Sequence, residues 1–486
     1  MDQVPDERVR DCNGAPVRAD GSYVLYWMTA FRRTRWNFSL QRAVELSREL
    51  GQPLLVLEAL RCGYPWASDR LHRFVMEGMR DNARQLDGST VRYYAYLEDA
   101  RGAGSGLLEA LASRAAAVVT DDYPAFFLPR MVAAAGERLD VRLEKVDSNG
   151  LIPIRSVEKV YESAYAFRRY IQKHLRPYLS SFPAPYPLLG GLPGQAEVPA
   201  EVSKRWPDAT PQLLDDSIDT SSFPIDHDVA PVEISGGADA ADAALRRFLD
   251  SRLSDYGELR NHPDERVTSE LSPYLHFGHI ASHQVFSELM ETEEWDVDGL
   301  SDDASGKRSG WWGVGESAEG FLDQLVTWRE LGFNMCVGRE DYDSYGSLPD
   351  WARETLEEHE KDEREHIYSL PEFAEARTHD EVWNAAQNQL LREGQLHNYM
   401  RMVWGKKILE WSPSPRDALE VMIELNNRYA LDGRDPNSYS GIFWCLGRYD
   451  RPWGPERPIF GKVRYMSSEN TVRKLRVSEY LEKYAP

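Results

Sequence analysis

The sequence predicts an α/β domain with a doubly wound parallel (Rossmann-like) sheet, followed by an all-α domain. Residues 22–145 alternate short apolar runs with amphipathic runs, which is typical of strand–helix repeats. From about residue 239 the pattern is almost wholly helical, without a convincing strand. Residues 181–238 are rich in Pro, Gly, Ser and Asp and are predicted as a long linker. We therefore expect an α/β domain at 20–180 and a helical domain at 239–486.

Each element of the first domain has its own signal. Apolar runs bounded by turn residues predict the strands, at 22–28, 53–60, 91–97, 116–120 and 140–146. Amphipathic runs predict the helices, at 36–50 with Gly51 as the stop, near 68–86, near 105–114 and near 124–136. Parallel sheets of this kind bind ligands beyond the carboxyl ends of the strands. The Gly-rich segment 101–106 does not directly follow a strand, so no nicotinamide dinucleotide site is expected.

Composition limits the class of protein. The chain has 486 residues, of which 42% are hydrophobic, and it reads as globular. It has no apolar run near 18 residues, so no membrane span is expected. The first residues are charged and lack the apolar core of a secretory signal. The four cysteines are scattered without a CxxC, which predicts neither disulfides nor a zinc site and favours a reducing, prokaryotic-type cytoplasm.

The net charge of −22 by itself argues against a nucleic-acid partner. Net charge describes the bulk field and not the sign of one groove. The chain from Arg451 onward is locally basic, with Arg451, Arg457, Lys462, Arg464, Arg473, Lys474 and Arg476. An acidic body with a local basic surface is therefore compatible with the sequence, and the acidity is compatible with a saline cytoplasm.

Five motifs of the helical half carry a family resemblance. They are TSELSPYLHFGHIASHQV (268–285), FLDQLVTWRELGFN (321–334), THDEVWNAAQ (378–387), HNYMRMVWGKKILEW (397–411) and LNNRYALDGRDPNSYSGIFWCLGRYDRPWGPERPIFGKVRYM (425–466). Together they resemble the DNA photolyase and cryptochrome family, and DGRDPN…FGKVRYM is similar to class II cyclobutane pyrimidine dimer photolyases. The resemblance implies a light-driven lyase that uses reduced FAD to split pyrimidine dimers in DNA. It also implies an antenna chromophore in the α/β domain, and no residue decides between a deazaflavin and a folate.

The expected FAD residues fall in two groups. The hydroxyls before the helix near 272 read by themselves as a helix cap. The resemblance implies instead that this segment, with Tyr256 upstream, holds the FAD diphosphate through Thr268, Ser269, Leu271 and Ser272. His276, His279 and His283 have helical spacing, but no metal site is expected because no carboxylate is interleaved in a known pattern.

The second group concerns the flavin ring. Arg401 and Asp432 read alone as surface charges, whereas the resemblance implies a salt bridge beside the isoalloxazine ring. Asn426 matches the residue that faces the flavin N5, and the adjacent Asn427 leaves this assignment open by one position. Gly405 would leave room for a close approach to the flavin.

Three tryptophans are candidates for electron transfer. Trp404 and Trp411 are seven residues apart, about two helical turns, so they share one face of a helix. Aromatic residues at this spacing are ordinarily core residues. The resemblance implies that these two, with Trp383, carry a hole from the flavin to solvent and so photoreduce the cofactor.

The substrate residues are also carried over from the resemblance. Gln324 and Trp328 are four residues apart and share a helix face. Trp328 and Trp444 would hold the flipped-out dimer, and Arg451 and Trp453 would enter the gap left in the duplex. Lys462 and Arg464 are expected at phosphates.

Gln324 departs from the family, which usually has Glu at this position. Gln keeps the length and can donate hydrogen bonds to base carbonyls, but it supplies neither a proton nor a negative charge. We expect repair to survive, with a lower yield as one outcome.

Two rival functions remain. A cryptochrome-like sensor with weak or no repair usually carries a C-terminal tail, and this chain ends about twenty residues after its last motif. A dark flavin oxidoreductase would need a nicotinamide site and an acid or base near the flavin. We expect a monomer that acts on damaged DNA without a membrane or an obligate protein partner.

Overall fold

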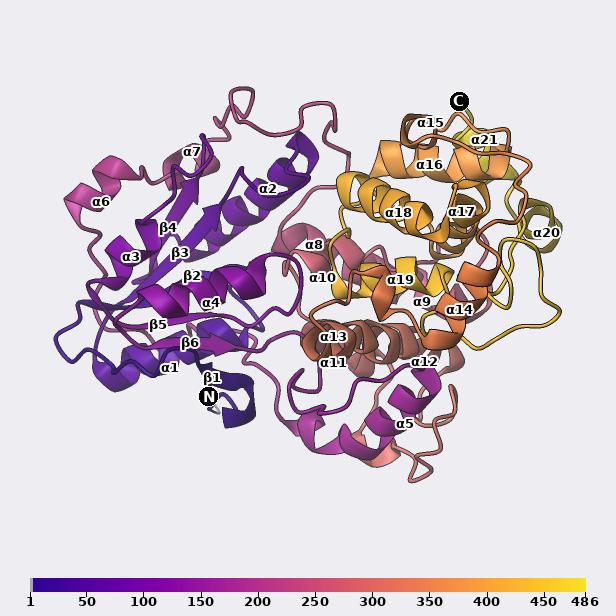
Figure 1. Cartoon of the computed structure of the whole chain (residues 1–486). Coiled ribbons are helices and arrows are strands. Elements are labelled where there is room, and N and C mark those ends of the chain that lie inside the picture. The colour runs from indigo at the N-terminus through magenta and orange to yellow at the C-terminus, as the bar shows by residue number, and fades with distance from the viewer. Residues whose placement is uncertain (1–2) are drawn as a thin grey trace. The chain divides into compact units, whose positions relative to one another are not determined.

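The computed structural model describes residues 3–486 (Figure 1). It divides into two compact units, each described by itself below. The α/β unit comprises Met1–Val157, Leu175–Arg246 and Leu271–Leu289. The helical unit comprises Glu158–His174, Arg247–Glu270 and Met290–Pro486.

A six-stranded sheet organises the α/β unit, in the order β1-β6-β5-β2-β3-β4. The strands are β1 (Val9–Asp11), β2 (Tyr23–Met28), β3 (Leu54–Leu60), β4 (Arg92–Leu97), β5 (Ala115–Asp121) and β6 (Leu143–Val146). Strands β2 to β6 are parallel, and β1 pairs antiparallel with β6 at the edge. The five predicted strands are all present. The short edge strand β1 was not predicted, because its three residues are half-buried or exposed and give no apolar run.

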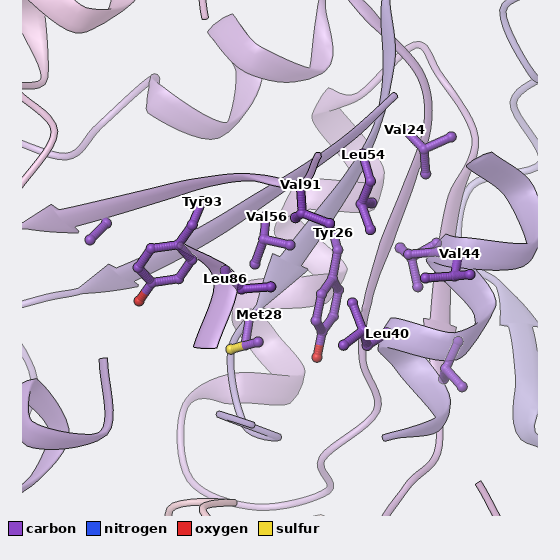
Figure 2. Packing of buried hydrophobic residues seen from close by; sticks show 14 of the residues in the cluster. Val24, Tyr26, Met28, Leu40, Val44, Leu54, Val56, Leu86, Val91 and Tyr93 are labelled. Atoms are coloured by element: carbon purple, nitrogen blue, oxygen red, sulfur yellow. The ribbon is translucent and has the colours of Figure 1, made fainter. Parts of the chain in front are cut away.

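The central strands carry apolar side chains on both faces, so both faces of the sheet are covered by helices. One core packs Val24, Tyr26 and Met28 of β2 against α1 (Phe38–Leu50) and α2 (Asp69–Leu86), as Figure 2 shows in part. The alternate residues of β2 join the opposite core, with α3 (Leu107–Ala112) and α4 (Leu128–Arg138). Successive strand residues point to opposite faces, so one strand serves both cores.

Helix α1 illustrates how local sequence sets the boundaries. The Asn37 side chain accepts hydrogen bonds from the backbone N–H groups of Ser39 and Leu40 at its start. Gly51 ends it in the left-handed conformation, at φ 64°. The predicted stop at Gly51 is therefore confirmed.

The segment 181–238, predicted as a linker, packs onto the α/β unit in part. It contains the short helices α6 (Ala200–Arg205) and α7 (Thr210–Leu214). Trp206 and Leu213 are buried, one in each core of the unit. The Pro- and Gly-rich composition of this segment correctly predicted a largely irregular backbone. Its attachment to the α/β unit depends on isolated apolar residues, which composition does not reveal.

The helical unit is built around α16 (Glu381–Glu393), α17 (Asn398–Trp411), α18 (Pro415–Tyr429) and α19 (Pro436–Cys445). Around them lie α5 (Ala164–His174), α9 (Leu253–Leu259), α12 (Glu316–Leu322), η4 (Asp323–Trp328), α13 (Arg329–Gly338), α14 (Asp350–Glu358), α15 (Leu370–Ala374), α20 (Ser468–Lys474) and α21 (Ser478–Lys483). Helix α10 (Ser272–His276) belongs to the α/β unit, while α8 (Ala238–Ser251) and α11 (Ser282–Thr292) run from one unit into the other. Within the described 239–486 no strand forms, as predicted. No helix among residues 3–486 is long and apolar enough to cross a membrane.

Candidate active site

Gln324 and Trp328 lie on η4, a π-helical turn between α12 and α13. Single π-helical turns inside helices occur frequently at functional sites. Both side chains are half-buried. Within residues 3–486 the Gln324 amide has no hydrogen-bond partner, and the Trp328 indole has neither a hydrogen bond nor a ring contact. The turn therefore carries an amide and an aromatic ring that both lack a partner within the described chain.

A buried ion pair holds this turn in place. Arg168 on α5 donates from Nε to Asp323 Oδ1 at 2.6 Å and from Nη2 to Oδ2 at 3.0 Å. Both side chains are at least nine-tenths buried. The Asp323 carboxylate beside Gln324 is thus engaged by Arg168, so it does not stand in for the Glu that the family usually has at Gln324.

Arg401 on α17 forms an ion pair with Asp432. Arg401 Nη2 donates to Asp432 Oδ1 at 2.9 Å and to Oδ2 at 3.0 Å, and both side chains are largely buried. Neither is therefore a solvated surface charge, which was the reading of each residue in isolation. A buried pair of this kind is costly unless well hydrogen-bonded, and here both carboxylate oxygens of Asp432 accept from Arg401.

The two adjacent asparagines on α18 have different surroundings. Asn427 is fully buried and satisfied: its Nδ2 donates to the Tyr439 hydroxyl, and its Oδ1 accepts from the backbone N–H of Arg434. Asn426 Nδ2 donates to Ser438 Oγ at 2.7 Å and to Asn427 Oδ1 at 3.3 Å. Within residues 3–486 the Asn426 Oδ1 accepts no hydrogen bond. Asn427 thus holds the 432–436 loop. Of the two amides, Asn426 is the one whose oxygen can still accept a hydrogen bond.

The expected diphosphate residues are assigned to different units and are described separately. In the helical unit, Tyr256 is buried between Phe248 and Phe321, and its backbone lies on α9. Burial raises the pKa of the Tyr256 hydroxyl, which accepts a long hydrogen bond from Arg260. The carbonyl of Thr268 accepts from Arg252, and its hydroxyl has no partner within residues 3–486. Ser269 is half-buried beside it.

The remaining two diphosphate candidates belong to the α/β unit. Leu271 is the N-terminal flanking residue of α10, with helical backbone angles and no side-chain cap. Ser272 is exposed. The capping function read from the hydroxyls alone is therefore wrong, because none of these side chains caps α10.

The three candidate tryptophans form one connected stack. Trp383 on α16 lies between the other two: its ring centroid is 6.5 Å from that of Trp404 with near-parallel planes, and 6.1 Å from that of Trp411. The Trp383 Nε1 donates to the Trp404 carbonyl, and the Trp404 Nε1 donates to Gln387. The order is therefore Trp404, Trp383, Trp411, with a residue from a second helix inserted between the pair on α17.

Trp411 is only 3% exposed, so it does not itself reach solvent. Its ring contacts Tyr368 at 5.7 Å and the exposed His379 at 5.0 Å. The Tyr368 hydroxyl lies 2.6 Å from His379 Nδ1. No sequence pattern indicates that Tyr368 and His379 extend the series of tryptophans, because these two residues approach Trp411 only through tertiary packing.

Gly405 does not face an open cofactor surface. A Cβ at this position would lie 2.5 Å from Cys445 Sγ and 3.1 Å from Met422 Sδ. The predicted close approach is therefore made by α19 and α18, and Gly405 serves the packing of these helices.

Trp444 and Trp453 lie in a cluster organised by Asp450. Arg464 donates to Asp450 at 2.9 Å, and Trp453 Nε1 donates to the same carboxylate at 3.1 Å. The Arg464 guanidinium carbon is 4.1 Å from the Trp453 ring centroid and 5.5 Å from that of Trp444. Hydrogen bonds from Arg464, Arg451 N–H and Trp453 lower the pKa of Asp450 despite its burial. Asp450 was not singled out from the sequence.

The remaining basic candidates are more exposed. Arg451 is exposed and lies over the Trp453 ring at 4.7 Å. Lys462 pairs with Glu456 at 3.0 Å, and both side chains are half-exposed, so this pair contributes little to stability. Phosphate contact by Lys462 and Arg464 stays a prediction. Arg464 is already engaged by Asp450 and two indoles, which favours a positioning role for it.

One of the three histidines at helical spacing, His279, lies in the core of the α/β unit. His279 is buried against Phe74, and burial lowers its pKa to about 3. Its Nδ1 accepts the backbone N–H of Gly237 at 2.9 Å. Among residues 3–486 no group of three or more His, Cys, Asp or Glu residues is arranged to hold a metal ion.

Known proteins similar to this chain are named for one activity. A deoxyribodipyrimidine photo-lyase of Methanothermobacter thermautotrophicus is 36% identical over 478 residues, covering 98% of each chain. The chain belongs to the deoxyribodipyrimidine photo-lyase family. Photo-lyases of Arabidopsis thaliana (31% identical, 94% of this chain and 88% of that one) and Potorous tridactylus (31%, 99% and 85%) are also similar. No family model matches the chain.

The fold agrees with a solved photolyase structure. The chain aligns with a bacterial class III photolyase from Agrobacterium tumefaciens with a TM-score of 0.64 at 16% identity, covering 96% of this chain and 86% of that one. At this identity the likeness supports the photolyase architecture of an α/β unit and a helical unit.

The asparagine pair gives a stability prediction. Asn427→Ala leaves the buried Arg434 N–H and Tyr439 hydroxyl without partners and should lower the free energy of unfolding by about 2–4 kcal/mol. Asn426→Ala removes one amide at the edge of this network and should cost about 1 kcal/mol. Urea midpoints measured by tryptophan fluorescence compare the two variants. Equal losses would show that Asn427 has no special role in holding the 432–436 loop.

Proposed function

We propose that this chain is a light-driven lyase that splits cyclobutane pyrimidine dimers in DNA. The observation that carries the proposal is the π-helical turn that presents the Gln324 amide and the Trp328 indole, both half-buried and both without a partner within residues 3–486. A half-buried amide that has no partner within the protein is available to a ligand as well as to solvent. The Gln324 amide can donate a hydrogen bond to the polar edge of a base, and the flat Trp328 indole can stack on the face of a base.

Membership in the photolyase family implies a flavin cofactor, and the residues of the helical unit fit FAD. Asn426 Oδ1 can accept a hydrogen bond, and the Thr268 hydroxyl can donate one. The Arg401–Asp432 pair supplies opposite charges that can tune a bound ring. Reduced FAD, when bound, supplies by photoexcitation the electron that the dimer accepts and later returns.

The chain positions this cofactor through named groups. Ser438 and Asn427 hold the Asn426 amide so that its oxygen, and not its nitrogen, remains available to a proton donor such as N5–H. Tyr256, Thr268 and Ser269 would hold the diphosphate from the helical unit, and Leu271 and Ser272 are expected to contribute from the residues that follow.

DNA contacts follow from the substrate chemistry. Photolyases extrude their target from the duplex, so the enzyme must compensate the lost base stacking. Trp328 and Trp444 would stack on the extruded dimer, and Gln324 would donate to its carbonyl oxygens. Arg451 and Trp453, held by Asp450, would occupy the gap in the duplex.

Electron supply would use the tryptophan stack. A hole formed at Trp404 can pass to Trp383 and Trp411, whose rings are within 6.5 Å of their neighbours. Tyr368 would continue the route from the buried Trp411 toward solvent, with His379 placed to take the phenolic proton.

An antenna chromophore is proposed for the α/β unit. Tyr64, Trp66, Phe126 and Phe127 form a half-exposed aromatic cluster just after the carboxyl ends of β3 and β5. Trp66 and Phe126 both have positive φ, at 63° and 62°, a strained conformation that is enriched at ligand sites. Flat ligands of doubly wound sheets bind at this edge, which suits a deazaflavin or a folate.

Illumination tests the proposed function directly. The purified protein, loaded with FAD and chemically reduced, should restore the ultraviolet absorbance of thymine in dimer-containing DNA under blue or near-ultraviolet light, and not in the dark. Gln324→Glu should retain the activity, because Glu is the residue the family usually has there. Binding of the damaged DNA without any dimer splitting would favour the sensor function instead.

The tryptophan stack gives a separate prediction. Trp383→Phe should abolish photoreduction of bound oxidised FAD, because Trp383 contacts both other rings and no direct contact between Trp404 and Trp411 exists within residues 3–486. It should leave repair by pre-reduced enzyme largely intact. Flash absorption spectroscopy measures the first effect, and the dimer assay the second.

Trp206→Phe is the matched control. Trp206 is also buried and also donates its Nε1 to a backbone carbonyl, that of Ala103, but it lies in the α/β unit. If photoreduction proceeds at the same rate in both variants, Trp383 is not part of the route.

A further inference from the structure

Lys406 on α17 is completely buried, at 0% exposure, although lysine is almost never fully buried. Its Nζ donates to the carbonyl of Cys445, the last residue of α19, at 2.6 Å. It also lies 4.9 Å from the centroid of the Trp444 ring. The ring is half-exposed, so this cation approaches it from the protein interior.

A helix cap alone does not require a buried cation here. Lys and Arg near a helix C-terminus stabilise the helix only modestly, and its last carbonyl groups can also be satisfied by neutral donors. Asp450, whose charge acts on Lys406, is already bound by Arg464. Within the described residues, Lys406 therefore forms no ion pair.

The tryptophans of the helical unit differ in the cations around them. Trp383 and Trp404, which are expected to carry a positive hole, contact no cation within residues 3–486, whereas Trp411 at the end of that route has Lys407 at 5.2 Å. Trp444, which is expected to stack on the dimer, has Lys406 at 4.9 Å and Arg464 at 5.5 Å. Positive charge beside a ring opposes a hole on that ring and favours negative charge on whatever stacks against it.

We propose that Lys406 is a positioning residue for dimer splitting, which holds Trp444 and places a fixed positive charge behind it to favour the electron on the stacked dimer. This inference rests on the proposed function. One electron enters the dimer, the two bonds that join the pyrimidines break, and the same electron leaves. Lys406 keeps its proton throughout.

The protonation of Lys406 provides a test. Burial lowers the pKa of Lys406 to about 8, with Arg464 lowering it further and Cys445 and Asp450 opposing. Burial raises the pKa of the Cys445 thiol to about 11, so this thiol stays neutral near pH 8. Asp450, with its lowered pKa, stays ionised. Below pH 8 Lys406 is therefore charged, and above pH 8 it loses its charge.

The experiment compares Lys406→Met with Lys407→Met, using FAD-loaded, pre-reduced enzyme saturated with dimer-containing DNA. Lys407 is the matched control, because it lies on the same helix but pairs with Glu410 and contacts Trp411. The repair yield per absorbed photon should fall about fivefold in Lys406→Met. It should be unchanged in Lys407→Met, and dark binding of the damaged DNA should change less than about twofold in both.

The pH profile keeps the test informative even if Lys406→Met folds poorly. The yield of the unaltered enzyme and of Lys407→Met should fall as pH rises through about 8, while that of Lys406→Met should stay low and flat. Repair by Lys406→Met with the same yield and pH profile as the unaltered enzyme overturns the inference alone. Absence of dimer splitting by the unaltered enzyme at every pH overturns the proposed function and the inference together.

Discussion

The close approach of α17 to α19 at Gly405 is the contact on which the helical unit depends. Any side chain there would collide with Cys445 Sγ, so the two helices can pack at this distance only over glycine. From this fixed helix Arg401 reaches Asp432, Trp404 stacks on Trp383, and Lys406 reaches the end of α19. One packing constraint thereby sets the relative positions of cofactor-side, electron-transfer and substrate-side groups.

The tryptophans of this unit differ in their surroundings. The stack of Trp404, Trp383 and Trp411 is buried, and its first two rings lack neighbouring cations within residues 3–486, so a hole can move along it. Trp444 and Trp453 are half-exposed and bordered by cations that Asp450 helps to hold. Trp328 has no partner within the described chain. The functions proposed for these tryptophans, which are hole conduction, electrostatic support and stacking, follow the charge and solvent around each ring.

Much of this arrangement could be predicted from the sequence, and the rest depends on tertiary packing. The strands and helices of the α/β unit follow from strong hydrophobic periodicity, whereas β1 is too short and too polar to give such a signal. Family resemblance named Trp383, but only the structure places it between two residues of another helix. The i, i+4 spacing of Gln324 and Trp328 predicted a shared face, but not the π-helical turn or the Arg168 pair that fixes it. Tyr368 and Asp450 were missed because neither carries a local pattern, and Gly405 was assigned to the cofactor because its true neighbours are distant in sequence.

The central claim is that one site in the helical unit joins a flavin to an extruded pyrimidine dimer. A crystal structure of the protein with FAD and a duplex containing a thymine dimer measures this directly. We expect the extruded dimer to stack on Trp328 and Trp444, with the Gln324 amide at a base carbonyl. Among the three linked tryptophans, Trp404 should lie nearest to the isoalloxazine ring. A dimer that remains stacked in the duplex, or one bound elsewhere while Gln324 and Trp328 face solvent, would contradict the account.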